Sequence, residues 1–158
     1  MSGDSEPRAR AARLAAVQIL YEIDMVGADI DDVLTDFLER RAADAADGEA
    51  RPRATLMTEI ARGALADRAT LDDVITGFVS SERGLARLDT VLRAVLRCGA
   101  FELKHRPAVP ARVVVSTYSD IAAAFFDAPQ DGVANAVLDR LARSLRAEEF
   151  AEDDPNAA

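Results

Sequence analysis

The sequence predicts an all-α protein of about seven helices. Apolar residues recur at steps of three and four along most of the 158 residues, which is the spacing of one helix face. The connections between these patterns are short, and no stretch alternates convincingly enough for a strand. A chain of this length fits one domain with a buried core. With 5% aromatic residues and no Trp, that core must be aliphatic.

Four of the expected helices lie in the first half of the chain. Gly27 ends the first, and the polar stretch 42–53 forms a loop because it contains Gly48 and Pro52. Thr70, followed three residues later by Asp73, resembles a capping box for the fourth helix. The expected helices cover residues 8–25, 29–43, 55–66 and 70–79.

The second half contains the strongest helical pattern, at residues 88–104, and Pro107 and Pro110 end it. Three consecutive valines at 113–115 would alone suit a strand. Helical spacing resumes after them, so a helix is expected there. The remaining expected elements are this helix at 111–126, a turn at 128–132 and a helix at 133–145.

The two ends of the chain are expected to be tails. We expect a flexible tail at 1–7, a single all-α domain at 8–147 and an acidic disordered tail at 148–158. The start is acidic and lacks the apolar segment of a signal peptide. No apolar run reaches the roughly 18 residues that a membrane span needs. The sequence therefore predicts a soluble cytoplasmic protein that has no membrane partner.

Few residues have side chains that could act in catalysis or bind a metal. Cys98 is the only cysteine and His105 the only histidine, which excludes an intrachain disulfide and a zinc site with the usual ligands. Cys98 lies beside an apolar helix face and is expected in the core, while His105 is expected at the surface or at a cap. The chain lacks phosphate-loop, dinucleotide, serine-hydrolase and zinc-protease motifs. We expect no catalytic residues, no metal and no cofactor.

The net charge of −9 argues against a nucleic-acid binder until its distribution is considered. Residues 22–49 hold ten acids and two arginines, and residues 148–154 hold five acids and no base. The rest of the chain therefore carries a net charge of +4. Arg10 and Arg13 share the first helix with Tyr21, whose ring would either stack on a base or belong to the core. The residues alone favour the second reading, in which the ring of Tyr21 belongs to the core.

Three segments resemble a known family. They are RARAARLAAVQILYEID at 8–24, RLDTVLRAVLRCGAFELKHRPAVPARVVVSTYSDIAAAFF at 87–126 and GVANAVLDRLA at 132–142. In this order they are similar to the first helix, the central helix with its VP loop, and the last helix of the transcription antitermination factor NusB family. The residues of these segments are most similar to those of the alphaproteobacterial branch of the family. The segments cover about half the chain.

The resemblance implies a fold, a function and partners. The fold would consist of two helical subdomains packed together, without catalysis. The protein would bind boxA-type single-stranded RNA together with NusE, a small-subunit ribosomal protein. The pair would join the RNA polymerase elongation complex and support ribosomal RNA transcription. Whether the chain is a monomer or a homodimer stays open.

The resemblance also assigns site residues. Arginine forks would clamp phosphates, a tyrosine ring would stack on a base, and an asparagine amide would read a base edge. One helix, at 88–104, would contribute to the partner surface. The RNA residues carried over are Arg8, Arg10, Arg13, Gln18, Tyr21 and Asn135, and the partner residues are Leu92 and Arg93.

Departures from the family pattern leave other functions open. Thr117 stands where an acid is common, Ala123 where a lysine is common, and Leu92 where many members have an acid. Val133 and Ala136 replace a Phe and a Gly. One alternative is a diverged interaction module with little or no RNA binding. Another is the RNA-binding appendage of a ribosomal RNA methyltransferase, although the chain has no glycine-rich cofactor loop and no catalytic Cys motif.

Overall fold

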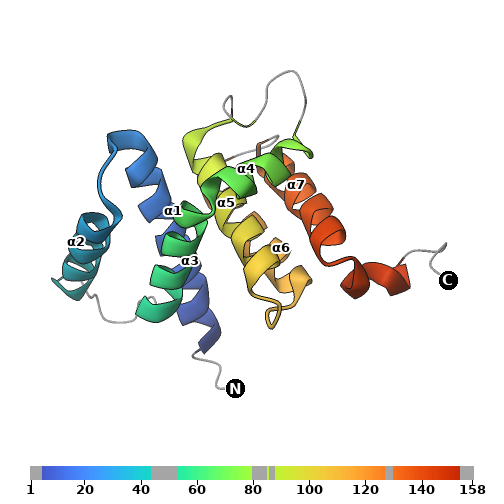
Figure 1. Ribbon diagram of the computed structural model, residues 1–158. Helices are drawn as coiled ribbons and strands as arrows, with labels where there is room; N and C mark the ends of the chain where they lie inside the picture. The colour runs from blue at the N-terminus through green and yellow to red at the C-terminus, as the bar shows by residue number, and fades with distance from the viewer. Residues whose placement is uncertain (1–4, 44–52, 80–84, 86–87, 127–129, 154–158) are drawn as a thin grey trace. The chain divides into compact units, whose positions relative to one another are not determined.

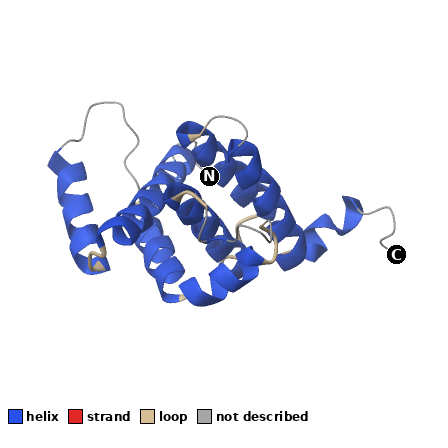
Figure 2. Cartoon of the chain, turned by 90° about the horizontal axis from the view of Figure 1, so that it is seen from above, coloured by secondary structure: helices blue, strands red, loops and turns tan. Residues whose placement is uncertain are grey.

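The computed structural model describes residues 5–43, 53–79, 85, 88–126 and 130–153, and these form helices without a strand (Figures 1 and 2). The predicted all-α class is confirmed. Within the described residues the elements are α1 (Ser5–Val26), α2 (Ile30–Ala43), α3 (Ala54–Ala66), α4 (Arg68–Thr76), α5 (Thr90–His105), α6 (Ala111–Phe125), α7 (Gln130–Leu145) and the 3-10 helix η2 (Ala147–Asp153).

The chain divides into two compact units, residues 1–66 and 67–158. The first unit contains α1, α2 and α3, and the second contains α4 to α7 with η2. This division agrees with the two helical subdomains that the family resemblance implies. In the described residues, no helix combines the length and the apolar character that crossing a bilayer requires.

In the first unit, α1 packs against α3 and also contacts α2 (Figure 1). The fully buried positions of α1 and α3 are mostly alanines. Small side chains let helix axes come close, so these two helices form a tight pair. Larger residues such as Ile19, Met57 and Ile60 fill the remaining space. The buried alanines are Ala12, Ala15, Ala16, Ala61 and Ala64.

In the second unit, α5 is the central helix and contacts α4, α6 and α7. Eleven of its 16 residues are buried, which is the pattern of a helix covered on all sides. Its Gly99 faces Leu138 of α7 and Tyr118 of α6. The strong apolar pattern at 88–104 therefore marks the helix around which the unit is built.

Polar side chains on α5 are buried with partners. The hydroxyl of Tyr118 donates to Oε2 of Glu102 across 2.6 Å, and both side chains are fully buried. Arg97 donates to both carboxylate oxygens of Asp72 on α4, at 2.8 and 2.9 Å. These pairs satisfy groups whose burial would otherwise cost free energy, and they fix α4 and α6 against α5.

Arg146, at the end of α7, holds the connection between α5 and α6. We call Arg146 and Glu149 together the Arg146–Glu149 clasp. Glu149 accepts from the guanidinium of Arg146 at 2.6 Å and from the backbone N–H of Ala111, the first residue of α6, at 2.9 Å. The Arg146 guanidinium donates to the main-chain oxygens of Glu102 (3.1 Å), Leu103 (2.6 Å), Arg106 (2.8 Å) and Val109 (3.0 Å).

The clasp works because helix ends leave backbone groups without partners. A cation at the last turn of α5 and a carboxylate at the first turn of α6 match the partial charges of the two helix ends. Arg146 is only 4% exposed, so water does not compete strongly for these carbonyls. The clasp therefore fixes the turn between two helices from a third.

The structure differs from the sequence prediction at α4. The predicted capping box at Thr70 and Asp73 is wrong, because α4 begins at Arg68 and Asp67 takes the N-cap position. Asp67 makes no side-chain cap hydrogen bond. Its carboxylate instead pairs with Lys104 at 2.9 Å and His105 at 2.8 Å. The capping-box pattern considers only residues that are close in sequence, whereas Lys104 and His105 lie at the end of α5.

Parts of the two segments expected as tails are helical. Helix α1 already begins at Ser5, inside the segment expected as a tail. After α7 the chain continues as η2, where Phe150 is only 6% exposed. Its aromatic surface and the carboxylate of Glu149 explain the order of an acidic segment. Parts of the expected loop at 42–53 and turn at 128–132 lie outside the described residues.

Replacing Gly99 with alanine is expected to destabilise the protein. A Cβ placed on Gly99 would lie 2.5 Å from Cδ2 of Leu138, which is fully buried and has little room to move. We expect a loss of about 1–3 kcal/mol in the free energy of unfolding, measured by urea denaturation. Gly132→Ala is the matched control, since nothing lies within 4 Å of its added Cβ. Equal stability of the two variants would contradict the close packing of α5 on α7.

The clasp predicts a pH dependence of stability. The backbone N–H of Ala111 and the guanidinium of Arg146 hold the pKa of the Glu149 carboxyl below its ordinary value of 4.5. A lowered folded-state pKa gives stability that is complete above about pH 4.5 and is lost as the pH falls through the folded pKa. Glu149→Gln should therefore be less stable than wild type near pH 7, with a difference that shrinks on acidification.

Glu148→Gln is the matched control for this measurement, because Glu148 is an exposed neighbour on η2. Unfolding free energies from urea titrations between pH 3 and pH 7 give the comparison. A difference between wild type and Glu149→Gln that does not change with pH would contradict the assigned contacts.

Candidate nucleic-acid interface

Helix α1 places three of the predicted RNA residues on an exposed surface. Arg10 and Tyr21 are eleven residues apart, so they lie about 20° apart around the helix and about 16 Å apart along it. Arg10 is exposed, and Tyr21 is 37% exposed. Gln18, which is half-buried, lies about 80° from Arg10. We call Arg10, Gln18 and Tyr21 the α1 face.

The other two arginines of α1 lie apart from this face. The side chain of Arg13 is 7% exposed, so it belongs to the interior rather than to the surface. Arg8 is exposed but lies about 160° around the helix from Arg10. The main-chain oxygen of Arg8 accepts from the N–H of Arg53, next to the start of α3. Arg10, Gln18 and Tyr21 thus remain at least partly exposed, whereas Arg13 is buried and Arg8 points to another side of the helix.

Among the described residues of the first unit, α2 carries the four acids Asp31, Asp32, Asp36 and Glu39, and α1 carries three acids. Arginines pair with several acids of this unit. Arg40 lies 3.1 Å from Asp36 and 3.7 Å from Glu22, and Arg62 of α3 pairs with Asp31. Exposed pairs of this kind add little stability, but they neutralise charge locally. An acidic total charge is therefore compatible with a cationic side chain on the α1 face.

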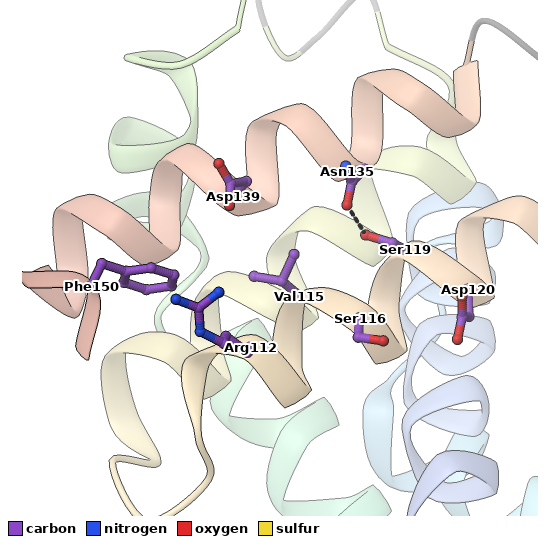
Figure 3. Close-up of a pocket in the computed structure, with 8 residues that line it drawn as sticks. All are labelled: Arg112, Val115, Ser116, Ser119, Asp120, Asn135, Asp139 and Phe150. Atoms are coloured by element: carbon purple, nitrogen blue, oxygen red, sulfur yellow. Dashed lines mark hydrogen bonds between the residues drawn. The ribbon is translucent and has the colours of Figure 1, made fainter. Parts of the chain in front are cut away.

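Asn135, the predicted RNA residue of the last helix, lies in a pocket between α6 and α7 (Figure 3). Its side-chain Oδ1 accepts from the hydroxyl of Ser119 at 3.0 Å. The pocket has a volume of about 340 Å³. We call it the α6–α7 pocket. It is lined by Arg112, Val115, Ser116, Ser119, Asp120, Asn135, Asp139 and Phe150.

Phe150 of η2 bounds one end of the α6–α7 pocket (Figure 3). The guanidinium carbons of Arg112 and Arg143 lie 4.9 and 4.8 Å from the centre of its ring. Arg143 also pairs with Asp139 one turn earlier on α7, at 3.0 Å. This aromatic ring therefore orders two arginines beside the pocket.

The predicted partner residues lie near the start of α5. Leu92 is 3% exposed, so its side chain offers a partner almost no surface. Arg93 is half-buried and donates to the hydroxyl of Thr90 at 3.1 Å. Of the two, Arg93 has the more accessible side chain. The partner roles of both residues stay predictions.

The single cysteine and the single histidine, whose side chains could act in catalysis, are both packed against other residues of the fold. Cys98 is fully buried, and burial raises the pKa of its thiol far above the ordinary value, as expected for a core cysteine. His105 packs on the ring of Phe101 with the ring centres 5.0 Å apart, and it pairs with Asp67. Among the described residues, no three His, Cys, Asp or Glu side chains are grouped to hold a metal ion.

Sequence reasoning identified Asn135 but missed the other polar residues of its pocket. They come from two helices and η2, so no short motif contains them. Arg112, Ser116 and Ser119 follow steps of four and three, which places them along one face of α6. This polar face on an otherwise apolar helix is the sequence pattern from which the pocket could have been predicted.

Comparison with known proteins identifies the fold and the family. A NusB structure from T. maritima matches with a TM-score of 0.75 and 25% identity, covering 90% of this chain and 96% of that one. A chain in the crystal structure of antitermination factors NusB and NusE in complex with dsRNA matches with a TM-score of 0.68 and 21% identity. It covers 85% of this chain and 96% of its own, and supports the fold alone. These likenesses define an all-helical protein of the NusB fold.

Sequence relatives make the assignment specific. A model of the NusB family matches residues 10–143. Transcription antitermination protein NusB of Rhodopseudomonas palustris (strain BisB5) is 44% identical over 142 residues, which cover 89% of this chain and 82% of that protein. The protein of the same name from Nitrobacter hamburgensis is 45% identical over 146 residues, covering 91% of each. The chain belongs to the NusB family.

The different burial of two α1 arginines predicts different effects on stability. Arg10→Ala should leave the thermal unfolding midpoint almost unchanged, because exposed substitutions usually cost little. Arg13→Ala should lower the midpoint by several degrees, since a packed arginine stem and its polar contacts are lost. Circular dichroism melts at one protein concentration compare the two. A larger loss for Arg10→Ala than for Arg13→Ala would contradict the orientation of α1.

Proposed function

We propose that this chain is a non-catalytic, cytoplasmic transcription antitermination factor. It binds boxA-type single-stranded RNA together with NusE and acts in the RNA polymerase elongation complex, supporting ribosomal RNA transcription. The observation that carries the proposal is the α1 face: an exposed arginine and an exposed tyrosine on one side of the first helix, in a chain of the NusB family.

The chemistry of the α1 face suits single-stranded RNA. The planar guanidinium of Arg10 donates to two phosphate oxygens at once. The ring of Tyr21 provides a surface for an unstacked base, and the amide of Gln18 offers a donor and an acceptor beside it. The distance of about 16 Å between Arg10 and Tyr21 corresponds to a few nucleotides of extended backbone.

Two observations support a role for a protein partner. First, a single cationic side chain on the α1 face gives weak and salt-sensitive RNA binding by itself. Second, a relative with the same fold is found in a crystal structure with NusE and dsRNA. A second RNA-binding protein beside this chain would raise the affinity by linking two contacts on one RNA.

The absence of catalysis is supported by the chemistry of the described residues. The thiol of Cys98 is buried, with a raised pKa, and His105 is held by Asp67 and Phe101. A nucleophile needs access, which the buried thiol lacks.

The proposal is tested by measuring the affinity for boxA RNA and for a scrambled RNA, with and without NusE, across a salt series. We expect a preference for boxA that increases when NusE is added, and an affinity that falls as salt rises. Equal affinity for boxA and scrambled RNA in the presence of NusE would overturn the proposal.

Single substitutions on the α1 face sharpen this test. Tyr21→Ala should weaken boxA binding about tenfold through loss of stacking, while Tyr21→Phe should keep most of the affinity. Arg10→Ala should reduce the slope of log affinity against log salt by about 0.7, as expected for one phosphate contact. Arg68→Ala, an exposed arginine on α4, is the matched control. Unchanged binding in both α1 variants would place the RNA elsewhere.

A second candidate function is a NusB-like interaction module with little or no RNA binding. The net charge of −9 and the departures at Thr117 and Ala123 favour it. It predicts a stable complex with NusE whose affinity for boxA RNA does not exceed that of NusE alone. The same titrations therefore separate the two functions.

A further inference from the structure

Two arginines of the second unit are held against one aromatic ring. The ring belongs to Phe150 of η2, and the guanidinium carbons of Arg112 on α6 and Arg143 on α7 lie 4.9 and 4.8 Å from its centre. The side chain of Phe150 is only 6% exposed, whereas both arginines are exposed. We call these three residues the arginine–phenylalanine stack.

The stack restricts two side chains that are flexible on an ordinary surface. Ordering an arginine when a ligand binds costs conformational entropy, and that cost is smaller when the side chain is already held. A ring attracts a guanidinium through its face, while the N–H groups lie in the plane of the guanidinium and suit phosphate oxygens. Two exposed guanidinium groups held by one ring therefore form a preorganised site for a phosphate backbone.

The carboxylates around the stack leave room for such a ligand. Asp139 pairs with Arg143 at 3.0 Å, but 43% and 48% of these side chains are exposed. Exposed pairs contribute little free energy, so a phosphate can replace this carboxylate. Glu149 is bound within the clasp, and Asp120 lies towards the other end of the α6–α7 pocket (Figure 3). Glu148 is exposed on η2 and is the acid that opposes an anion here.

The stack lies along the helix that carries a predicted RNA residue. Asn135, Asp139 and Arg143 follow one another at steps of four on one side of α7, and Arg143 is about 12 Å from Asn135 along the axis. Arg112 and Phe150 also line the pocket that contains Asn135 (Figure 3). An RNA strand that contacts Asn135 would therefore reach the stack within a few nucleotides.

We propose that the arginine–phenylalanine stack contacts the phosphate backbone of single-stranded RNA, in addition to the contacts made by the α1 face. Arg112 and Arg143 donate to phosphate oxygens, and Phe150 is the positioning residue that holds both arginines. Backbone contacts carry no sequence information directly, so the stack raises affinity for every RNA sequence alike. This inference rests on the proposed function and adds a path for the RNA over α6, α7 and η2.

Removing the charge of each arginine is the first test. RNA affinity is measured for the complex of the full chain with NusE, using boxA RNA and scrambled RNA across a salt series. Arg112→Gln and Arg143→Gln should each weaken binding about fivefold near 0.1 M salt and reduce the slope of log affinity against log salt by about 0.7. Both RNAs should lose affinity by the same factor. Arg68→Gln, at an exposed position of α4, is the matched control and should leave the affinity almost unchanged.

A neutral substitution separates positioning from packing. Phe150→Leu keeps an apolar side chain and the net charge but removes the ring that holds the arginines. We expect RNA affinity to fall about threefold, because both arginines must then be ordered on binding. Ile75→Val, which trims a fully buried side chain of α4 in the same unit, is the control for lost stability. It should leave RNA affinity unchanged, and a purely structural Phe150 would behave in the same way.

The Asp139–Arg143 pair provides a third measurement. Asp139→Asn should strengthen RNA binding, because it releases the guanidinium of Arg143 from its carboxylate partner. Asp73→Asn removes an exposed acid from α4 and should give only a small general gain. In the Arg143→Gln background the gain from Asp139→Asn should fall to that of Asp73→Asn, since the released group is then absent.

Two outcomes would overturn the inference while leaving the proposed function intact. One is wild-type affinity in Arg112→Gln, Arg143→Gln and Phe150→Leu, while Tyr21→Ala still weakens boxA binding. The other is a loss of affinity for boxA RNA alone, with scrambled RNA unaffected, because a backbone contact does not distinguish sequences. If the wild-type complex with NusE does not prefer boxA RNA, the proposed function fails and the inference fails with it.

Discussion

The second unit depends on one guanidinium group. Arg146 is buried and donates to four main-chain oxygens at the end of α5 and in the turn that follows, while Glu149 links it to the first N–H of α6. Burying this cation would be costly without those partners. The turn between α5 and α6 would in turn leave its carbonyls unpaired without the cation. Each part is therefore stable only because the other is present.

This clasp also shapes the candidate site. Because Glu149 is held at the start of α6, the chain continues as η2 and carries Phe150 to the end of the α6–α7 pocket. The ring then orders Arg112 and Arg143 beside the pocket. A segment that looks like an acidic tail in the sequence thus completes a polar pocket, and its packing couples the stability of the second unit to its surface chemistry.

Helical periodicity predicted most of the fold, since the expected ranges match seven helices in the described residues and Cys98 lies in the core as expected. It failed where a residue's partner is distant in sequence, as at Asp67, whose carboxylate binds Lys104 and His105 instead of capping α4. The site was harder to predict. Spacing alone does not show that Arg13 turns inward, and no local motif joins residues of α6, α7 and η2 into one pocket.

We propose that this acidic chain of the NusB family meets RNA through the α1 face and through Asn135 of α7. The most direct test is backbone amide NMR of the ¹⁵N-labelled chain, titrated with boxA RNA in the presence of unlabelled NusE and compared with NusE alone. We expect RNA-dependent shifts at Arg10, Gln18 and Tyr21, and also at Asn135. Shifts that NusE alone reproduces, with none added by the RNA at either surface, would contradict this proposal.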